Sequence, residues 1–173
     1  MKGVIADCLG KLVKDKFGVD KWEKSLENAG MNTKTVFIAT QDIPDSDVMK
    51  LVGSVCKILN ITLQQAADAF GDYWVNEYAK KVYFAYFSKS KTAKDFLLNM
   101  DKVHISVTQN VKNAKPPRFE YTWENDKTLI MKYLSSRGLI DFLVGLIKGV
   151  GKYFNENLTV SKVGSDRVKI VFA

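Results

Sequence analysis

The sequence is short of the residue types on which many functional sites depend. Its 173 residues include one histidine and two cysteines. A structural zinc site takes four ligands, so these three residues cannot complete one without carboxylates. Cys8 and Cys56 lie on apolar faces of expected helices. That placement predicts buried thiols rather than a disulfide, and a reducing, cytoplasmic location.

Long hydrophobic runs are also absent. No apolar run approaches the roughly 18 to 20 residues of a membrane span. Asp7 and Asp15 interrupt the segment after Met1-Lys2 where a signal peptide would need its hydrophobic core, so no export signal is expected. The length predicts a single domain over residues 1–173, large enough to bury a core.

The common signatures of catalysis are missing as well. There is no Gly-x-Ser-x-Gly, no phosphate-binding glycine loop and no paired metal motif. The acidic pair Asp45 and Asp47 is typical of a helix start. We therefore expect no enzymatic activity.

The charge balance is basic, with a net charge of +7 and a pI near 9.3. Lysines alternate with aromatic residues between residues 80 and 94, a combination that single-stranded nucleic acid binders use. However, the chain has only three arginines and no nucleic-acid motif. A solvated basic face without a nucleic-acid partner is favoured, and a basic nucleic-acid-binding module is the alternative from a different class.

The first two-thirds of the chain has the apolar spacing of helices. Three polar residues are expected to cap them: Asp20, Thr62 in a capping box with Gln65, and Thr92. The spacing predicts helices over about 4–13, 20–30, 46–59, 62–70, 72–87 and 92–104.

From Arg118 the apolar period changes to two, which indicates strands. The pattern predicts a hairpin over 119–134, a helix over about 139–154, and a second hairpin over 158–171. Helices followed by two hairpins around one helix predict an α+β fold with a four-stranded antiparallel sheet.

The lone His104 precedes a Tyr-x-Ser-x-Arg run formed by Tyr133, Ser135 and Arg137. Neutral imidazole is a good iron ligand. On an extended chain, side chains at alternate positions point to one face, so these three could bind a pair of carboxylates such as the haem propionates. Taken alone, the histidine is more often a hydrogen-bonded core or surface residue, and the arginine a surface cation.

With these residues in place, the chain resembles the H-NOX family of haem nitric oxide/oxygen-binding domains. Further matches are the Met1-Lys2-Gly3 start, Phe70-Gly71, Asp101-x-x-His104, Pro116-Pro117 and Gly145-Leu146-Ile147. The resemblance implies a distal helical half over about 1–88 and a proximal half with the sheet over 89–173, with haem b buried between them.

The resemblance also implies roles for individual residues. His104 is expected to be the proximal iron ligand and the only protein ligand to the metal, with Asp101 one helical turn earlier as its partner. Tyr133, Ser135 and Arg137 are expected to clamp the propionates, and Pro117 to pack against the porphyrin. The expected distal pocket consists of Ile5, Leu9, Trp74, Tyr78, Phe142 and Leu146.

One distal position bears on which gas is bound. H-NOX domains that hold oxygen stably carry a tyrosine nine residues after the motif tyrosine, where this chain has Phe142. Losing one hydrogen bond to a charged group, about 1.5 to 3 kcal/mol, lowers affinity roughly tenfold to a hundredfold. We expect nitric oxide and carbon monoxide to bind without a stable oxygen complex. An oxygen-binding domain that uses Trp74 or Tyr78 as its distal donor is the alternative.

The resemblance further implies a sensor. Nitric oxide is expected to weaken the bond from iron to His104, and the freed helix is expected to change the conformation. Family members signal to histidine kinases, cyclic-dinucleotide enzymes or chemotaxis receptors. As an isolated domain the chain is expected to be a monomer.

Overall fold

The computed structural model describes residues Met1–Ala173, which form two compact units, Met1–Ala66 and Ala67–Ala173. The predicted halves met near residue 88, whereas the division between the compact units falls earlier, inside the predicted distal half. None of the helices combines the length and apolar character that crossing a bilayer requires. Cys8 is buried, Cys56 is half-buried, and both are free thiols.

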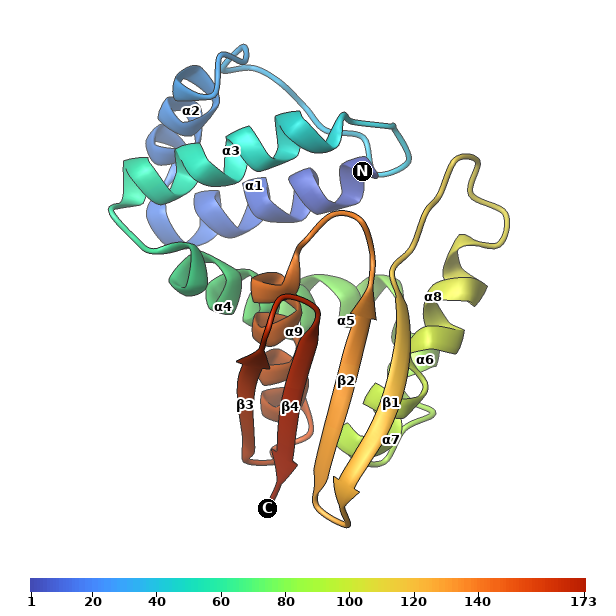
Figure 1. The fold of residues 1–173 in the computed structure, drawn as a ribbon. Coiled ribbons are helices and arrows are strands. Elements are labelled where there is room, and N and C mark those ends of the chain that lie inside the picture. Colours follow the sequence, from blue (N-terminus) through green and yellow to red (C-terminus); the bar gives the residue numbers. More distant parts are fainter. The chain divides into compact units, whose positions relative to one another are not determined.

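The first unit is helical, and its apolar stripes pack together as predicted. Its long helices are α1 (Gly3–Phe17), α2 (Val19–Asn28) and α3 (Asp45–Leu59) (Figure 1). Fully buried side chains on them are Cys8, Val13, Leu26 and Leu51. The Ser54 hydroxyl donates to the Ser25 carbonyl at 2.6 Å and so ties α3 to α2 inside this core.

The helix ends in this unit agree only partly with the prediction. Asp20 does not cap α2, because the cap is Gly18 at φ 96°, a backbone conformation that favours glycine. Asp20 lies instead in the first turn, where its charge favours the helix dipole. The capping box is confirmed: the Thr62 amide donates to Gln65 Oε1 at 2.8 Å, and the Gln65 amide donates to Thr62 Oγ1 at 3.1 Å.

The chain passes from the first unit to the second within a helical segment that the prediction divided wrongly at Gly71. Gly71 lies inside α4 (Leu63–Tyr73). A Cβ on it would come within 2.1 Å of the Gly145 carbonyl carbon on α9 (Ile140–Tyr153), so this glycine permits close helix packing rather than ending a helix. The chain then continues through a π-helix and two short helices, η1 (Trp74–Ala79), α5 (Lys80–Val82) and α6 (Phe84–Phe87).

The predicted helix over 92–104 is also divided. Thr92 caps α7 (Ala93–Leu98) through a 3.0 Å bond from the Asp95 amide, as predicted. However, α7 ends before Asn99, and His104 belongs to the next helix, α8 (Met100–Thr108). The two helices separate because the hydroxyl of Tyr121, on the sheet, lies between the Asp101 amide and the Leu97 carbonyl. In a continuous helix these two backbone groups would bond to each other.

The sheet confirms the predicted α+β class. Its strands are β1 (Arg118–Asn125), β2 (Thr128–Leu134), β3 (Leu158–Val163) and β4 (Arg167–Phe172), in the antiparallel order β1-β2-β4-β3. Alternate residues of the central strands are fully buried: Leu129, Met131, Val168 and Ile170. The helix α9 packs against β3 and β4 and lies behind them in Figure 1.

Candidate functional site

His104 presents an imidazole whose charged form is disfavoured. The residue is partly exposed, but its Nδ1 is buried and makes no hydrogen bond of good geometry, although the imidazole lies close enough to the Met100 carbonyl for that oxygen to affect its pKa. Burial lowers the pKa of His104, while the Met100 carbonyl and the Asp101 carboxylate raise that pKa by less. A neutral imidazole keeps a nitrogen lone pair with which it can bind a metal ion.

The carboxylate of Asp101 bonds to β1 and not to the imidazole. It accepts two hydrogen bonds from Arg118, at 2.7 Å from Nε and 2.8 Å from Nη2, and a third from the Phe119 amide at 2.9 Å. The Arg118 side chain is the main reason that the pKa of Asp101 falls to about 2. Asp101 therefore fixes the start of α8 to the strand and acts on His104 only through its charge.

Phe119 joins the two parts of the site that the sequence predicted separately. Its ring centroid lies 5.4 Å from that of His104 and 6.1 Å from that of Tyr133. Phe119 and Tyr133 are both buried and are paired across β1 and β2. Sequence reasoning gave Phe119 no role, although its inward position in the alternating strand pattern was the available signal.

A turn after β2 presents the rest of the Tyr-x-Ser-x-Arg run. The strand ends at Leu134, so Tyr133, Ser135 and Arg137 do not lie on one extended strand as predicted. Instead the Arg137 amide donates to Ser135 Oγ at 3.3 Å, a local turn of the kind that serine favours. The Arg137 guanidinium donates to the Lys115 carbonyl at 2.6 Å.

These contacts tie down the loop that contains Pro117. Arg137 holds the carbonyl of Lys115 on one side of this half-buried proline, and the ion pair of Arg118 with Asp101 holds the other side. The loop before β1 thus connects the helix of His104 to the turn after β2. The structure brings His104, Pro117 and the Tyr-x-Ser-x-Arg run into one connected network.

A second group of predicted residues forms a row of aromatic rings within the unit Ala67–Ala173. Phe70 packs edge-on against Phe142 with centroids 5.4 Å apart, and stacks on Trp74 at 5.8 Å. Trp74 stacks in turn on Tyr78 at 5.3 Å. Phe142 is buried, and Leu146, one turn later on α9, is half-buried. The row is apolar at Phe142 and carries an indole and a phenol at its other end.

Trp74 and Tyr78 both lie on the π-helix η1. The side-chain amide of Asn76, on the same segment, donates from Nδ2 to the Asp72 carbonyl and to the Gly149 carbonyl of α9, each at 3.2 Å. These bonds anchor the widened turn. Such π-helical turns are rare and often occur at functional sites. The sequence has no pattern that distinguishes this segment from an ordinary helix.

The remaining predicted pocket residues, Ile5 and Leu9, lie on α1 in the unit Met1–Ala66. Ile5 is half-buried and Leu9 is buried. Their membership of the same pocket stays a prediction.

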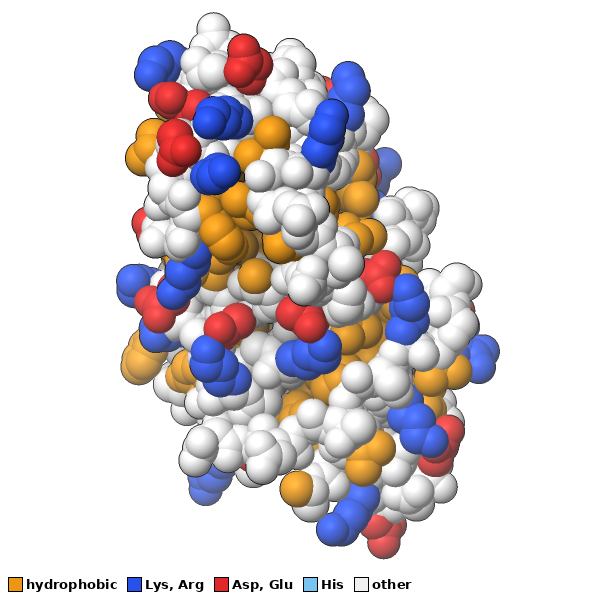
Figure 2. Space-filling view, turned by 90° about the vertical axis from the view of Figure 1, so that its left-hand side faces the viewer, with side chains coloured by type: hydrophobic (Ala, Val, Ile, Leu, Met, Phe, Trp, Pro, Cys, Tyr) orange, Lys and Arg blue, Asp and Glu red, His pale blue; other side chains and the backbone are white.

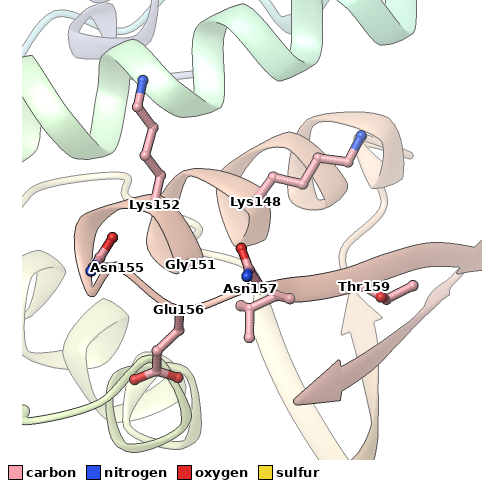
Figure 3. A pocket seen from close by; sticks show the side chains of 8 residues that line it. Lys148, Gly151, Lys152, Asn155, Glu156, Asn157 and Thr159 are labelled. Carbon is pink, nitrogen blue, oxygen red and sulfur yellow. The ribbon is translucent and has the colours of Figure 1, made fainter. Parts of the chain in front are cut away.

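The chain also has a surface hollow of about 390 Å³ at the end of α9, which Figure 3 shows. Its lysines point towards α4, where Lys148 pairs with Asp68 at 2.7 Å and Lys152 pairs with Asp72 at 2.6 Å. Glu156 accepts a bond from the amide of Ala93. These charges already have partners, so the hollow is not the candidate site.

Several lysines of the basic segment between residues 80 and 94 contact side chains of the same protein. Lys80 and Lys81 lie 3.9 and 3.8 Å from Glu77, and Lys94 lies 4.4 Å from the ring centre of Trp123. The local pairing of Lys80, Lys81 and Lys94 favours a solvated surface over a nucleic-acid track. Elsewhere, on the face that Figure 2 shows, acidic and basic side chains are also interspersed.

No three histidine, cysteine or acidic side chains gather closely enough to hold a metal ion by themselves. A metal at His104 would need its other ligands from a cofactor. Haem supplies four nitrogens in this way, so the one uncharged imidazole fits haem better than it fits a protein-only metal site.

Comparison with known proteins agrees with this geometry. The model of a family described as haem-NO-binding matches residues 2–162. Soluble guanylate cyclase gcy-34 of Caenorhabditis elegans is 30% identical over 98% of this chain and 25% of its own length. Soluble guanylate cyclase gcy-32 of the same organism is 29% identical over 88% of this chain and 23% of its own length. The chain spans about a quarter of the length of these relatives.

Two solved structures share the fold. A mutant H-NOX of T. tengcongensis superposes with a TM-score of 0.85 and 26% identity, covering 99% of this chain and 97% of that one. An oxygen-binding H-NOX domain related to soluble guanylate cyclases superposes with a TM-score of 0.81 and 27% identity, covering 99% and 95%.

The ion pair of Asp101 predicts a pH-dependent contribution to stability. Because its folded-state pKa is depressed to about 2, the contribution is present above the unfolded value near 4 and is lost as pH falls through about 2. Asp101→Asn should lower the free energy of unfolding at pH 7 by about 1 kcal/mol, after allowance for screening at the half-exposed Arg118.

Denaturant unfolding at pH 7 and at pH 2.5 measures this difference, with Asp126→Asn in the turn between β1 and β2 as the control. The difference in the free energy of unfolding between wild type and Asp101→Asn should be smaller at pH 2.5 than at pH 7. An equal difference at both pH values would contradict the stabilising role of the Asp101 ion pair.

Proposed function

Because the chain belongs to the haem-NO-binding family, a family of haem-binding gas sensor domains, we propose that it senses nitric oxide through haem b bound to His104. In this proposal the ferrous haem is five-coordinate, binds nitric oxide and carbon monoxide, and forms no stable oxygen complex. The single observation that carries the proposal is the buried His104 Nδ1, which makes no hydrogen bond of good geometry. A histidine that served only to fill the core would be expected to have its ring nitrogens hydrogen-bonded.

The chain's own groups match what haem needs. His104 would provide the axial nitrogen, and burial keeps it neutral. Tyr133, Ser135 and Arg137 offer hydroxyl and guanidinium donors for the propionates, next to the loop of Pro117 that would face the porphyrin. When bound, haem supplies an iron with a free coordination position at which a diatomic gas can bind.

The choice of gas follows from which donors reach the distal side. Phe142 is buried and has no hydrogen-bonding group, which supports weak stabilisation of oxygen. The alternative, an oxygen-binding domain, rests on the indole of Trp74 and the phenol of Tyr78 in the same aromatic row. One structural neighbour is described as an oxygen-binding H-NOX domain, so oxygen binding does occur on this fold.

Signalling in this proposal is a conformational change that begins at α8. His104 would hold the iron from α8, and if nitric oxide weakened that bond, the released helix could change its position on β1. The chain itself is not proposed to be an enzyme. It would pass the signal to a partner such as a histidine kinase, a cyclic-dinucleotide enzyme or a chemotaxis receptor, and as an isolated domain it would be a monomer.

Arg137 gives a direct test of the propionate clamp. Its removal would leave carboxylates unpaired in a partly buried site, so Arg137→Ala should purify with at least fivefold less haem per chain. The haem-to-protein absorbance ratio measures this, and Arg167→Ala on β4 is the matched control because Arg167 only approaches Asp166, at 3.8 Å. Normal haem occupancy in Arg137→Ala would overturn the clamp assignment.

The gas selectivity predicts a simple spectroscopic result. The ferrous protein in air should show no lasting oxygen complex, whereas nitric oxide and carbon monoxide should each shift its absorption spectrum, because Phe142 offers bound oxygen no hydrogen bond. A persistent oxygen complex would contradict the selectivity. Its loss in Trp74→Phe or Tyr78→Phe would then support the alternative.

A further inference from the structure

The helix that carries His104 is interrupted one turn before the histidine. α7 ends at Leu98 and α8 begins at Met100, with Asn99 between them at φ −89° and ψ −5°. In an unbroken α-helix the amide of Asp101 would donate to the carbonyl of Leu97.

The hydroxyl of Tyr121 stands in place of that backbone bond. It accepts a hydrogen bond from the Asp101 amide at 3.4 Å and donates one to the Leu97 carbonyl at 2.9 Å. A side chain inserted in this way into the hydrogen-bond ladder is a recognised cause of a helix break. Burial raises the pKa of Tyr121 to about 12, so the hydroxyl keeps the proton that it donates.

The same strand holds the side chain of Asp101. Both guanidinium contacts of Arg118 and the amide of Phe119 converge on this carboxylate. The aromatic side chains of Phe119 and Tyr121 alternate along β1 and so face the same way. One ring lies against His104 and the other bridges the helix break. Three residues of β1 thus control where α8 starts and how it lies.

We propose that Tyr121 and Arg118 are positioning residues for His104, with the Tyr121 hydroxyl holding open a hinge at Asn99 and Arg118 restraining the helix on β1. This inference rests on the proposed function, because His104 needs positioning only if it binds the metal. The hinge has two arrangements: a broken helix with the hydroxyl inserted, and a continuous helix with a direct bond from the Asp101 amide to the Leu97 carbonyl. An element with two discrete arrangements is what a switch requires.

The restraint has a consequence for gas binding. While Tyr121 and Arg118 hold α8 in place, His104 could not follow the haem iron if nitric oxide drew the iron away, so the bond between His104 and the iron would break more readily. Without the restraint, α8 could move together with the iron, and the bond would survive. Loss of either residue should therefore preserve histidine ligation in the presence of nitric oxide.

The test uses Tyr121→Phe, which removes the hydroxyl and keeps the ring, in the haem-loaded protein. The control Tyr153→Phe removes a hydroxyl from the same unit without touching α8. Hydrogen exchange at the Asp101 amide should change at least tenfold in Tyr121→Phe and remain at the wild-type rate in the control. An unchanged rate at Asp101 would overturn the hinge.

The second measurement concerns ligation. In Tyr121→Phe the iron–histidine stretching band of the ferrous protein should shift, and the six-coordinate share of its nitric oxide complex should rise at least twofold. Arg118→Met should do the same from the half-exposed side of the site, so the test survives if Tyr121→Phe folds poorly. Arg118→Lys should restore part of the wild-type behaviour, and Arg167→Met should have no effect.

The outcomes separate this inference from the function on which it rests. If the wild type binds haem through His104, but Tyr121→Phe and Arg118→Met leave the stretching band and the coordination unchanged, the positioning role is wrong and the proposed function stands. If the wild type takes up no haem, the proposed function fails, and the positioning role fails with it.

Discussion

The proposed site depends on one imidazole, held beside a β-sheet, whose charged form is disfavoured by burial. Burial lowers the pKa of His104, and no hydrogen bond satisfies its Nδ1. Leaving a buried polar atom unpaired costs about 1 to 3 kcal/mol, so an arrangement that keeps it needs compensation from the surrounding contacts or from a ligand. The surrounding contacts are concentrated at the start of α8, where the Asp101 carboxylate accepts three hydrogen bonds from β1.

Strand β1 links these contacts to the rest of the site. Its period of two turns Phe119 and Tyr121 towards the helices, and its first residue, Arg118, reaches Asp101. Phe119 also contacts Tyr133 on β2, and the turn that follows β2 carries Arg137 back to the loop before β1. A displacement of α8 would therefore act on the sheet and on the turn that carries Arg137.

The sequence predicted those parts of the fold that local patterns determine. The capping groups of Thr62 and Thr92 and the two hairpins follow from spacing within a few residues. The predicted helix boundaries are wrong where contacts with residues distant in the sequence determine where a helix ends. The break before α8 requires Tyr121, and Gly71 continues a helix because Gly145 packs against it. The predicted site residues came from a sequence motif. Arg118, Phe119 and Tyr121 belong to no such motif, and only their contacts in the structure place them beside His104 and Asp101.

The central claim is that His104 binds the haem iron, and replacing this imidazole tests it most directly. The wild-type chain, reconstituted with haem, should show an intense Soret band and a five-coordinate ferrous spectrum. His104→Gly should lose that coordination and regain it when free imidazole is added. A colourless reconstituted wild type, or a glycine variant with unchanged five-coordination in the absence of imidazole, would contradict the account.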